Sequence, residues 1–245
     1  MVNDDSSHVC RTTRISMFRG LVFALLSVLT HVAFAQEISA TRGQQIATTG
    51  IAGVTACISC HGLRGEGGVS FPRLAGTGAQ YLQAQLDAFA AGTRKSSIMQ
   101  PLAGKLAQAD RASVALYFSR LAPPFTAHDR PSASPEDGAW LATRGRWSQA
   151  IPACTQCHGP GGNGVGEHFP PLAGLPVAYI EAQLQSWKAA TRPAGPMELM
   201  QAVALKLSDA DVLAVSSYFA GLASPGEATA VPPAAPASSA AGVKK

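Results

Sequence analysis

Two five-residue stretches decide the fold of this chain: Cys57-Ile58-Ser59-Cys60-His61 and Cys154-Thr155-Gln156-Cys157-His158. Both have the pattern C-x-x-C-H, and together they hold four of the five cysteines. The surrounding sequence repeats too, because Phe71-Pro72-Arg73-Leu74-Ala75-Gly76 matches Phe169-Pro170-Pro171-Leu172-Ala173-Gly174. Self-similarity over this length predicts that one domain is present twice.

The repeat also sets the domain boundaries. We expect domains at residues 36–121 and 136–222, joined by a linker at 122–135 and followed by a tail at 223–245. The linker contains four prolines, which predicts a semi-rigid connector. The tail is rich in Ala, Pro and Ser, which predicts disorder.

The first 35 residues have the features of a cleaved secretory signal. Arginines precede a short apolar run, which ends in the small-residue sequence Ala33-Phe34-Ala35. Met17 is an alternative start to Met1. A retained anchor helix is the other interpretation, but the apolar run is shorter than the roughly 20 residues that a membrane span needs. Cleavage would remove the odd Cys10 and place the protein in the periplasm.

Helical periodicity is present in both copies, and no strand alternation is found. Amphipathic helices are expected at about 78–91 and 176–190, with a shorter helix before each cysteine pair. Ser208 followed by Asp211 resembles a helix start. Apolar residues at positions i, i+3, i+4 and i+7 mark the last helix of each copy: Val114, Tyr117, Phe118 and Leu121, then Val215, Tyr218, Phe219 and Leu222. The predicted fold class is all-α.

The C-x-x-C-H pattern points to covalent haem attachment. Two thiols one helical turn apart can each form a thioether with a haem vinyl group, and the adjacent His61 or His158 can ligate the iron. Three other roles for the cysteine pairs fit the sequence less well. A thioredoxin-type pair expects a βαβ context, a zinc site needs four ligands close together, and disulfides within C-x-x-C are strained. Two haem c groups are the favoured prediction.

Methionine supplies the expected sixth ligand. Met99 and Met200 occupy matching places in the two copies, and Met197 is the runner-up for the second haem. A thioether is soft and neutral, so His/Met ligation raises the reduction potential and closes the iron to substrates.

A second set of residues is expected to support the haems. A backbone carbonyl at Pro72 or Pro170 can accept the proton on Nδ1 of the ligating histidine. Arg94 and Arg192 precede the methionines and can pair with haem propionates, although a solvated arginine is an equal alternative.

These motifs resemble the dihaem cytochrome c4 family, which has two class I cytochrome c domains in tandem, each wrapped around one covalently bound haem. The resemblance runs from Gly43 to Leu222 and rests on both C-x-x-C-H motifs, both P-x-L segments and both Tyr-x-x-x-Gln-Leu helices. It implies a periplasmic, often membrane-associated carrier of single electrons from the bc1 complex or a dehydrogenase to a terminal oxidase.

Electron transfer without catalysis on this chain is therefore the expected function. The alternative is the cytochrome subunit of a periplasmic oxidoreductase whose catalytic centre lies on another chain; an open-iron enzyme or gas sensor is disfavoured by the two methionines. After signal cleavage the chain carries 16 Lys and Arg against 13 Asp and Glu, too weak a balance to indicate nucleic acid. Residues 36–121 have a net charge of +4 and residues 136–222 of −2, which predicts that redox partners dock on different domains.

Overall fold

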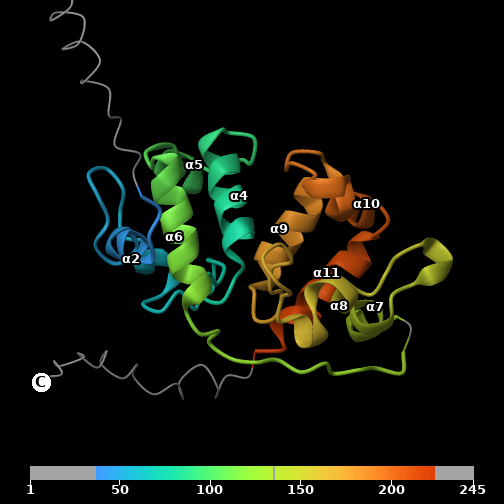
Figure 1. Cartoon of the computed structure of the whole chain (residues 1–245). Coiled ribbons are helices and arrows are strands. Elements are labelled where there is room, and N and C mark those ends of the chain that lie inside the picture. The colour runs from blue at the N-terminus through green and yellow to red at the C-terminus, as the bar shows by residue number, and fades with distance from the viewer. Residues whose placement is uncertain (1–36, 135, 224–245) are drawn as a thin grey trace, which may run out of the picture. The chain divides into compact units, whose positions relative to one another are not determined.

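The structure, a computed structural model, describes residues 37–134 and 136–223. All of its helices lie in the unit that begins at Ile38. The expected signal and nearly all of the expected tail lie outside the described residues. Within the described ranges there are only helices, turns and three isolated β-bridges, so the all-α prediction is confirmed (Figure 1).

The first domain contains five helices. Their bounds are α2 (Ala40–Thr49), α3 (Ile58–His61), α4 (Ala79–Ala90), α5 (Met99–Gly104) and α6 (Gln108–Arg120). The second domain repeats the order with α7 (Gly138–Arg144), α8 (Cys154–His158), α9 (Val177–Lys188), α10 (Leu199–Ala204) and α11 (Asp209–Ala220). Short 3-10 turns at Trp147–Gln149, Pro160–Gly162 and Pro196–Glu198 distinguish the second domain.

The core of each domain forms on its last helix, as the apolar periodicity predicts. Val114 and Phe118 of α6 are buried, and so are Val215 and Phe219 of α11. The two phenylalanine rings are each packed edge-on against the preceding tyrosine ring, at 5.1 Å between centroids. The Ser208 start signal is also confirmed, because its side chain and that of Asp211 form a capping box at the start of α11.

A glycine on the first helix of each domain permits close helix packing. A Cβ added at Gly43 in α2 would lie 1.9 Å from the backbone oxygen of Ser113 in α6. A Cβ added at Gly138 in α7 would lie 2.1 Å from the backbone oxygen of Ala214 in α11. No side chain fits at either crossing, so glycine fixes how closely the first and last helices approach.

The described part of the linker is held against the second domain by hydrogen bonds. The backbone of Ala127 exchanges two hydrogen bonds with the side chain of Asn163, at 2.9 and 2.8 Å. The Arg130 N–H donates to the hydroxyl of Tyr218, and the Arg130 guanidinium donates to the carbonyl of Gly221. These contacts give an ordered connector rather than a loose tether.

Candidate functional site

The two C-x-x-C-H sequences fold as single helical turns. In α3, the N–H groups of Cys60 and His61 both donate to the carbonyl of Cys57, at 3.2 and 3.0 Å. The first cysteine of each pair is half-buried and the second is exposed, and none of the four is in a disulfide. Both thiols of a pair therefore lie on one turn, next to the histidine, as covalent attachment to a planar group requires.

Burial keeps the first thiol of each pair neutral. It raises the pKa of Cys57 to about 11 and that of Cys154 to about 12. A buried position that disfavours thiolate accepts a thioether well, because a thioether carries neither charge nor proton. This matches conversion of both sulfurs into covalent links.

The histidines are oriented by the carbonyls that the sequence singled out. Nδ1 of His61 lies 2.8 Å from the Pro72 oxygen, and Nδ1 of His158 lies 2.7 Å from the Pro170 oxygen. A carbonyl only accepts, so Nδ1 carries the proton and Nε2 keeps a lone pair. Burial lowers the pKa of both imidazoles and outweighs the opposing effect of these hydrogen bonds. Each ring is thus a neutral ligand with Nε2 free for a metal.

Glycine-rich loops attach each histidine turn to the last helix. The N–H of Gly67 donates to the His61 carbonyl, and the N–H of Gly164 donates to the His158 carbonyl, both at 2.7 Å. Gly65 has φ +70° and packs against Phe118, since a Cβ there would lie 2.9 Å from the ring. The loop therefore connects the His61 turn to Phe118, which is 1% exposed.

Apolar side chains beside each histidine are only partly covered by protein. Cys57 and Leu74 in the first domain, and Cys154 and Leu172 in the second, pack against a core without being buried by it. An apolar planar cofactor can cover such a face, and the donor set of two thiols and one neutral imidazole is the one that haem c takes. The residues present therefore fit the expected group in both domains.

The expected methionines lie on the short helices α5 and α10. Met99 begins α5 and is half-buried, with its N–H bonded to the Ser96 hydroxyl. Met200 is half-buried and packs against the core of the second domain. Met197, the runner-up, is 84% exposed and has φ 57°. The two half-buried methionines thus occupy matching positions in the duplicated domains.

Arg94 is not the solvated arginine that the sequence left open. It is 7% exposed, and its guanidinium donates to Gln85 in its own domain at 2.9 Å. It also donates to Gln183 at 2.7 Å and to the Tyr179 hydroxyl at 3.2 Å, both in the second domain. Its guanidinium lies 4.5 Å from the centre of the Phe89 ring.

Arg192 makes the reciprocal contacts. It is 6% exposed and donates to Gln183 at 3.0 Å, to Gln85 at 2.9 Å and to the Tyr81 hydroxyl at 3.1 Å. Burial lowers its pKa, and the nearby Arg94 charge acts in the same direction. Each arginine thus bonds both glutamines and one tyrosine of the other domain, and none of these partners is a carboxylate. We refer to the six residues as the arginine-glutamine network.

Sequence reasoning missed this network although a signal existed. Tyr, Gln and Arg recur at one constant spacing in both copies, and polar side chains that are buried together are nearly always hydrogen-bonded. His128 and His168 are exposed, as expected for residues with no counterpart in the other copy.

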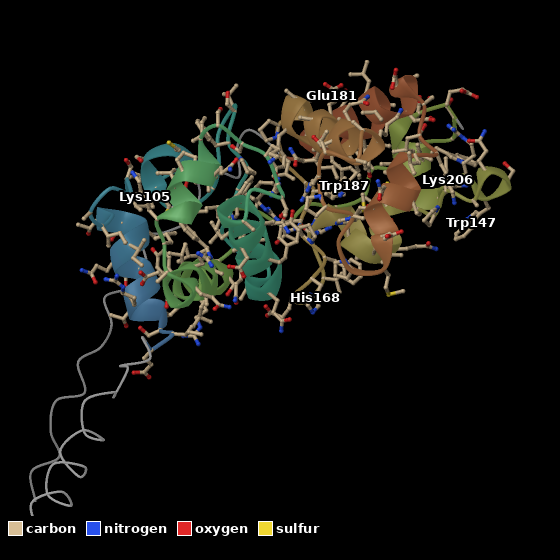
Figure 2. All side chains as sticks on the ribbon, turned by 90° about the horizontal axis from the view of Figure 1, so that it is seen from above. Lys105, Trp147, His168, Glu181, Trp187 and Lys206 are labelled. Carbon is tan, nitrogen blue, oxygen red and sulfur yellow. The ribbon has the colours of Figure 1, made fainter. Side chains whose placement is uncertain are left out.

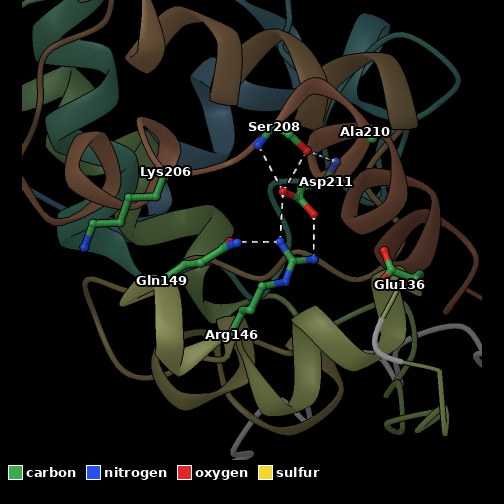
Figure 3. A pocket seen from close by; sticks show the side chains of 7 residues that line it. All are labelled: Glu136, Arg146, Gln149, Lys206, Ser208, Ala210 and Asp211. Carbon is green, nitrogen blue, oxygen red and sulfur yellow. Dashed lines mark hydrogen bonds and ion pairs between the residues drawn. The ribbon is translucent and has the colours of Figure 1, made fainter.

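A hollow of about 690 Å³ lies on the second domain, and it is lined neither by the candidate haem residues nor by the arginine-glutamine network (Figure 3). Its floor is a double hydrogen bond between the guanidinium of Arg146 and the carboxylate of Asp211, at 2.9 and 3.2 Å. The lining is mostly polar and includes the first residues of α11, but none of the candidate haem residues: Glu136, Arg146, Gln149, Lys206, Ser208, Ala210 and Asp211.

No group of three or more His, Cys, Asp or Glu side chains in the described ranges could hold a metal ion. Among the same residues, no helix has the length and apolar character needed to cross a membrane.

Comparisons with known proteins agree with this geometry. The family model "Cytochrome c" matches the chain twice, over residues 40–120 and 142–223. A "Thiosulfate dehydrogenase electron acceptor" of Stutzerimonas stutzeri is 44% identical over 76% of this chain and 88% of its own. A "Cytochrome c4" of Pseudomonas aeruginosa is 36% identical over 72% of this chain and 88% of its own.

Two solved structures are also similar. The thiosulfate dehydrogenase TsdBA of Marichromatium purpuratum has a TM-score of 0.67 at 41% identity, over 74% of this chain and 40% of that chain. Reduced cytochrome c4 of Pseudomonas stutzeri has a TM-score of 0.63 at 32% identity, over 76% of this chain and all of that chain. This chain thus spans less than half of the Marichromatium chain and the full length of the cytochrome c4 chain.

Proposed function

Because this chain belongs to the cytochrome c family, we propose that it is a periplasmic dihaem electron carrier whose electron donor is a thiosulfate-oxidising dehydrogenase. It is an electron-transfer protein with two covalently bound haem c groups. The observation that carries the proposal is the duplicated C-x-x-C-H turn, each with its histidine held by a proline carbonyl. Two such turns in one chain support two redox centres.

Each domain contributes the same set of haem residues. Cys57 and Cys60 would hold the haem of the first domain through two thioethers, and His61 and Met99 would ligate its iron. The bound haem supplies an iron that takes up and releases one electron. The carbonyl of Pro72 holds the imidazole in one orientation and keeps the proton on Nδ1. Cys154, Cys157, His158, Met200 and Pro170 have the same roles in the second domain.

The arginine-glutamine network supplies the positive charge that the haem propionates need. Two buried guanidiniums share neutral amide and hydroxyl partners, which leaves both charges uncompensated within the network. Buried charges are stable only when paired, and carboxylates suit guanidinium best. Arg94 and Arg192 would therefore pair with propionates of the two haems, which would link both haems to one network.

The sequence and the relatives support a cellular compartment for the carrier and a class of electron donor. The signal-like first 35 residues support export to the periplasm, where peripheral contact with the membrane is compatible with the family. The relatives named as electron acceptors of thiosulfate dehydrogenase support the donor class. From the carrier, electrons pass to a respiratory acceptor such as a terminal oxidase.

A second candidate is a respiratory carrier reduced by the bc1 complex, which the relatives named cytochrome c4 support. The test is to mix the oxidised holoprotein with thiosulfate, with and without a purified thiosulfate dehydrogenase, and to follow the absorbance of reduced haem. We expect reduction only when the dehydrogenase is present. Absence of reduction there, together with rapid reduction by quinol and bc1 complex, would replace the first candidate by the second.

A further inference from the structure

The loop that follows each ligating histidine has the same backbone hydrogen bonds in both domains. The Gly65 N–H donates to the Gly62 carbonyl at 2.9 Å, and the Gly162 N–H donates to the Gly159 carbonyl at 2.8 Å. The carbonyls of Gly65 and Gly162 each accept an N–H from the leucine of the P-x-L segment, at 2.8 Å. Each loop therefore joins the histidine turn to the segment whose proline carbonyl orients the imidazole.

In the first domain, a side chain of the loop itself completes this arrangement. The carboxylate of Glu66 accepts the N–H of Arg64 at 2.8 Å. A Cβ added at Gly62 would lie 2.5 Å from the same carboxylate, so the Glu66 side chain folds back over the loop. The acceptor for the Arg64 N–H thus comes from within the loop that follows His61.

In the second domain, the linker supplies the matching carboxylate. Gly161 stands at the place of Arg64, and its N–H donates to the carboxylate of Asp129 at 2.8 Å. The same N–H of the loop is therefore bound by a carboxylate in both domains. In one domain it belongs to Glu66, two residues away, and in the other to Asp129, 32 residues earlier in the chain.

Asn163, at the place of Glu66, attaches the linker to the loop a second time. Its side chain exchanges two hydrogen bonds with the backbone of Ala127 and donates to the Pro160 carbonyl at 2.7 Å. Ala127 is 4% exposed. A Cβ added at Gly161 would lie 2.2 Å from the Ala127 oxygen, and Gly161 has φ +64°. Glycine at this position therefore leaves room for the linker to lie against the loop.

We propose that Ala127 and Asp129 are positioning residues of the second haem site: they hold the loop that follows His158 in the conformation that orients this ligand. The inference rests on haem attachment in the second domain and not on which protein donates the electrons. A buried backbone N–H needs an acceptor, and the linker provides one for Gly161. The loop also bonds to the histidine, because the Gly164 N–H donates to its carbonyl at 2.7 Å. The second haem site thus begins at Ala127, ahead of the domain boundary expected at residue 136.

The test is hydrogen exchange in the reduced full-length holoprotein, measured by NMR and resolved by residue. We expect D129A to speed exchange of the Gly161 amide about tenfold, the effect of losing one hydrogen bond to a charged group. The Nδ1 proton of His158 should also exchange faster, because the loop opens more often, whereas that of His61 should keep its rate. D129N should retain most of the protection, since its amide oxygen still accepts. N163A should speed exchange of the same two protons as D129A.

Two matched controls separate positioning from a general effect of mutation. H128A changes an exposed linker residue between the two that bind the loop, and it should alter none of these rates. E66A removes the corresponding carboxylate of the first domain. It should speed exchange of the Arg64 amide and of the Nδ1 proton of His61, and leave the second domain unchanged.

Three results would overturn the proposal. They are an unchanged Nδ1 exchange rate of His158 in D129A, an equal increase for His61, and an effect of H128A as large as that of D129A. If D129A does not fold, an unchanged His158 rate in N163A overturns the proposal instead. Because no electron donor is present in the experiment, a wrong donor assignment cannot produce any of these results.

Discussion

Burial distinguishes Met200 from Met197, two methionines that sequence spacing leaves as competing candidates for the ligand of the second haem. Met197 itself has the left-handed φ of 57° and is 84% exposed, whereas Met200 packs against the core of the second domain. A ligand to a buried haem iron must itself be held against the core, since an exposed side chain loses rotamer freedom on binding. This favours Met200 as the partner of His158.

M200L is expected to remove about half of the charge-transfer absorbance from methionine sulfur to ferric iron, because one of two haems loses its thioether ligand. M99L should remove the other half, and M197L should leave the band intact. The measurement is the visible spectrum of the oxidised holoprotein. Loss of the band in M197L but not in M200L would reverse the assignment.

At the residue scale, the sequence predicts the chemistry near each cysteine pair better than the contacts farther away. The hydrogen bonds from His61 and His158 to proline carbonyls span only 11 and 12 residues, within one motif. The bonds of Arg94 to Tyr179 and of Arg192 to Tyr81 span 85 and 111 residues. Both arginines lie in loops, after α4 and after α9, and are buried only because the other domain covers them, so their burial could not be predicted locally.

The crossing of α2 and α6 yields a stability prediction at the scale of elements. G43A places a methyl group where the Ser113 carbonyl oxygen is 1.9 Å away, so the helices must separate. We expect the free energy of unfolding of the first domain to fall by about 1–3 kcal/mol. Denaturant unfolding of the holoprotein measures it.

G104A is the matched control for this substitution. Gly104 ends α5, and a Cβ added there has no neighbour within 4 Å. It should leave stability unchanged or raise it by up to roughly 1 kcal/mol, as alanine favours helix over glycine. Equal stability of G43A and the unmodified protein would contradict the argument from close packing.

The capping box of α11 makes the second domain sensitive to pH. Burial acts to raise the pKa of Asp211, but hydrogen bonds from Arg146 and Ser208 outweigh it, and the pKa is lowered. A carboxyl group with a lowered pKa stabilises the fold above its unfolded pKa, and this stability is lost as pH falls through the folded pKa. At neutral pH, D211N should therefore lower the free energy of unfolding of the second domain by about 1 kcal/mol, as the loss of a helix cap does.

The free energies of unfolding of D211N and of the unmodified protein should be compared from neutral to acidic pH. The difference between D211N and the unmodified protein is expected to vanish once Asp211 is protonated. D209N serves as the control, because Asp209 lies in the same helical turn, is 85% exposed and makes only a surface ion pair with Lys188, which contributes little to stability. A pH-independent difference for D211N would show that shape rather than charge matters there.

Long helices were the elements that the sequence predicted well. The expected helix at 78–91 is α4, Ala79–Ala90, and that at 176–190 is α9, Val177–Lys188, because amphipathic periodicity acts over several turns. The six-residue helices α5 and α10 carry too few turns for such a pattern. They depend on packing against their domains, so their methionines could be placed by repeat alignment but not by periodicity.

The hydrogen bonds that join the two domains are not all symmetric. The arginine-glutamine network is nearly symmetric, but Glu167 has no symmetric counterpart. Its backbone oxygen accepts the Tyr81 N–H at 2.9 Å and its carboxylate accepts the Gln80 N–H at 3.2 Å, at the start of α4. A negative charge at a helix N-terminus is stabilising. The second domain thus caps a helix of the first, and Val69 at the matching position cannot do the same in return.

The two domains also differ in net charge, which affects where redox partners dock. The first domain has 8 Lys and Arg against 4 Asp and Glu, and the second has 5 against 7. Lys105 and Lys206 provide a matched pair of probes, because they occupy equivalent positions and each donates to a loop carbonyl, at 3.1 and 2.9 Å. Figure 2 labels both side chains. Because both are exposed, reversing either charge changes the surface and not the core.

K105E is expected to slow either reduction or oxidation of the carrier by roughly threefold to tenfold at low ionic strength, because an acidic partner docks on the basic first domain. K206E should leave that same half-reaction nearly unchanged. Stopped-flow rates measured over a range of salt concentrations check this, and high salt should bring K105E and the unmodified protein together since screening removes steering. If both substitutions alter the same half-reaction equally, partners do not choose between the domains by charge, and the opposite signs of the two domains have no part in docking.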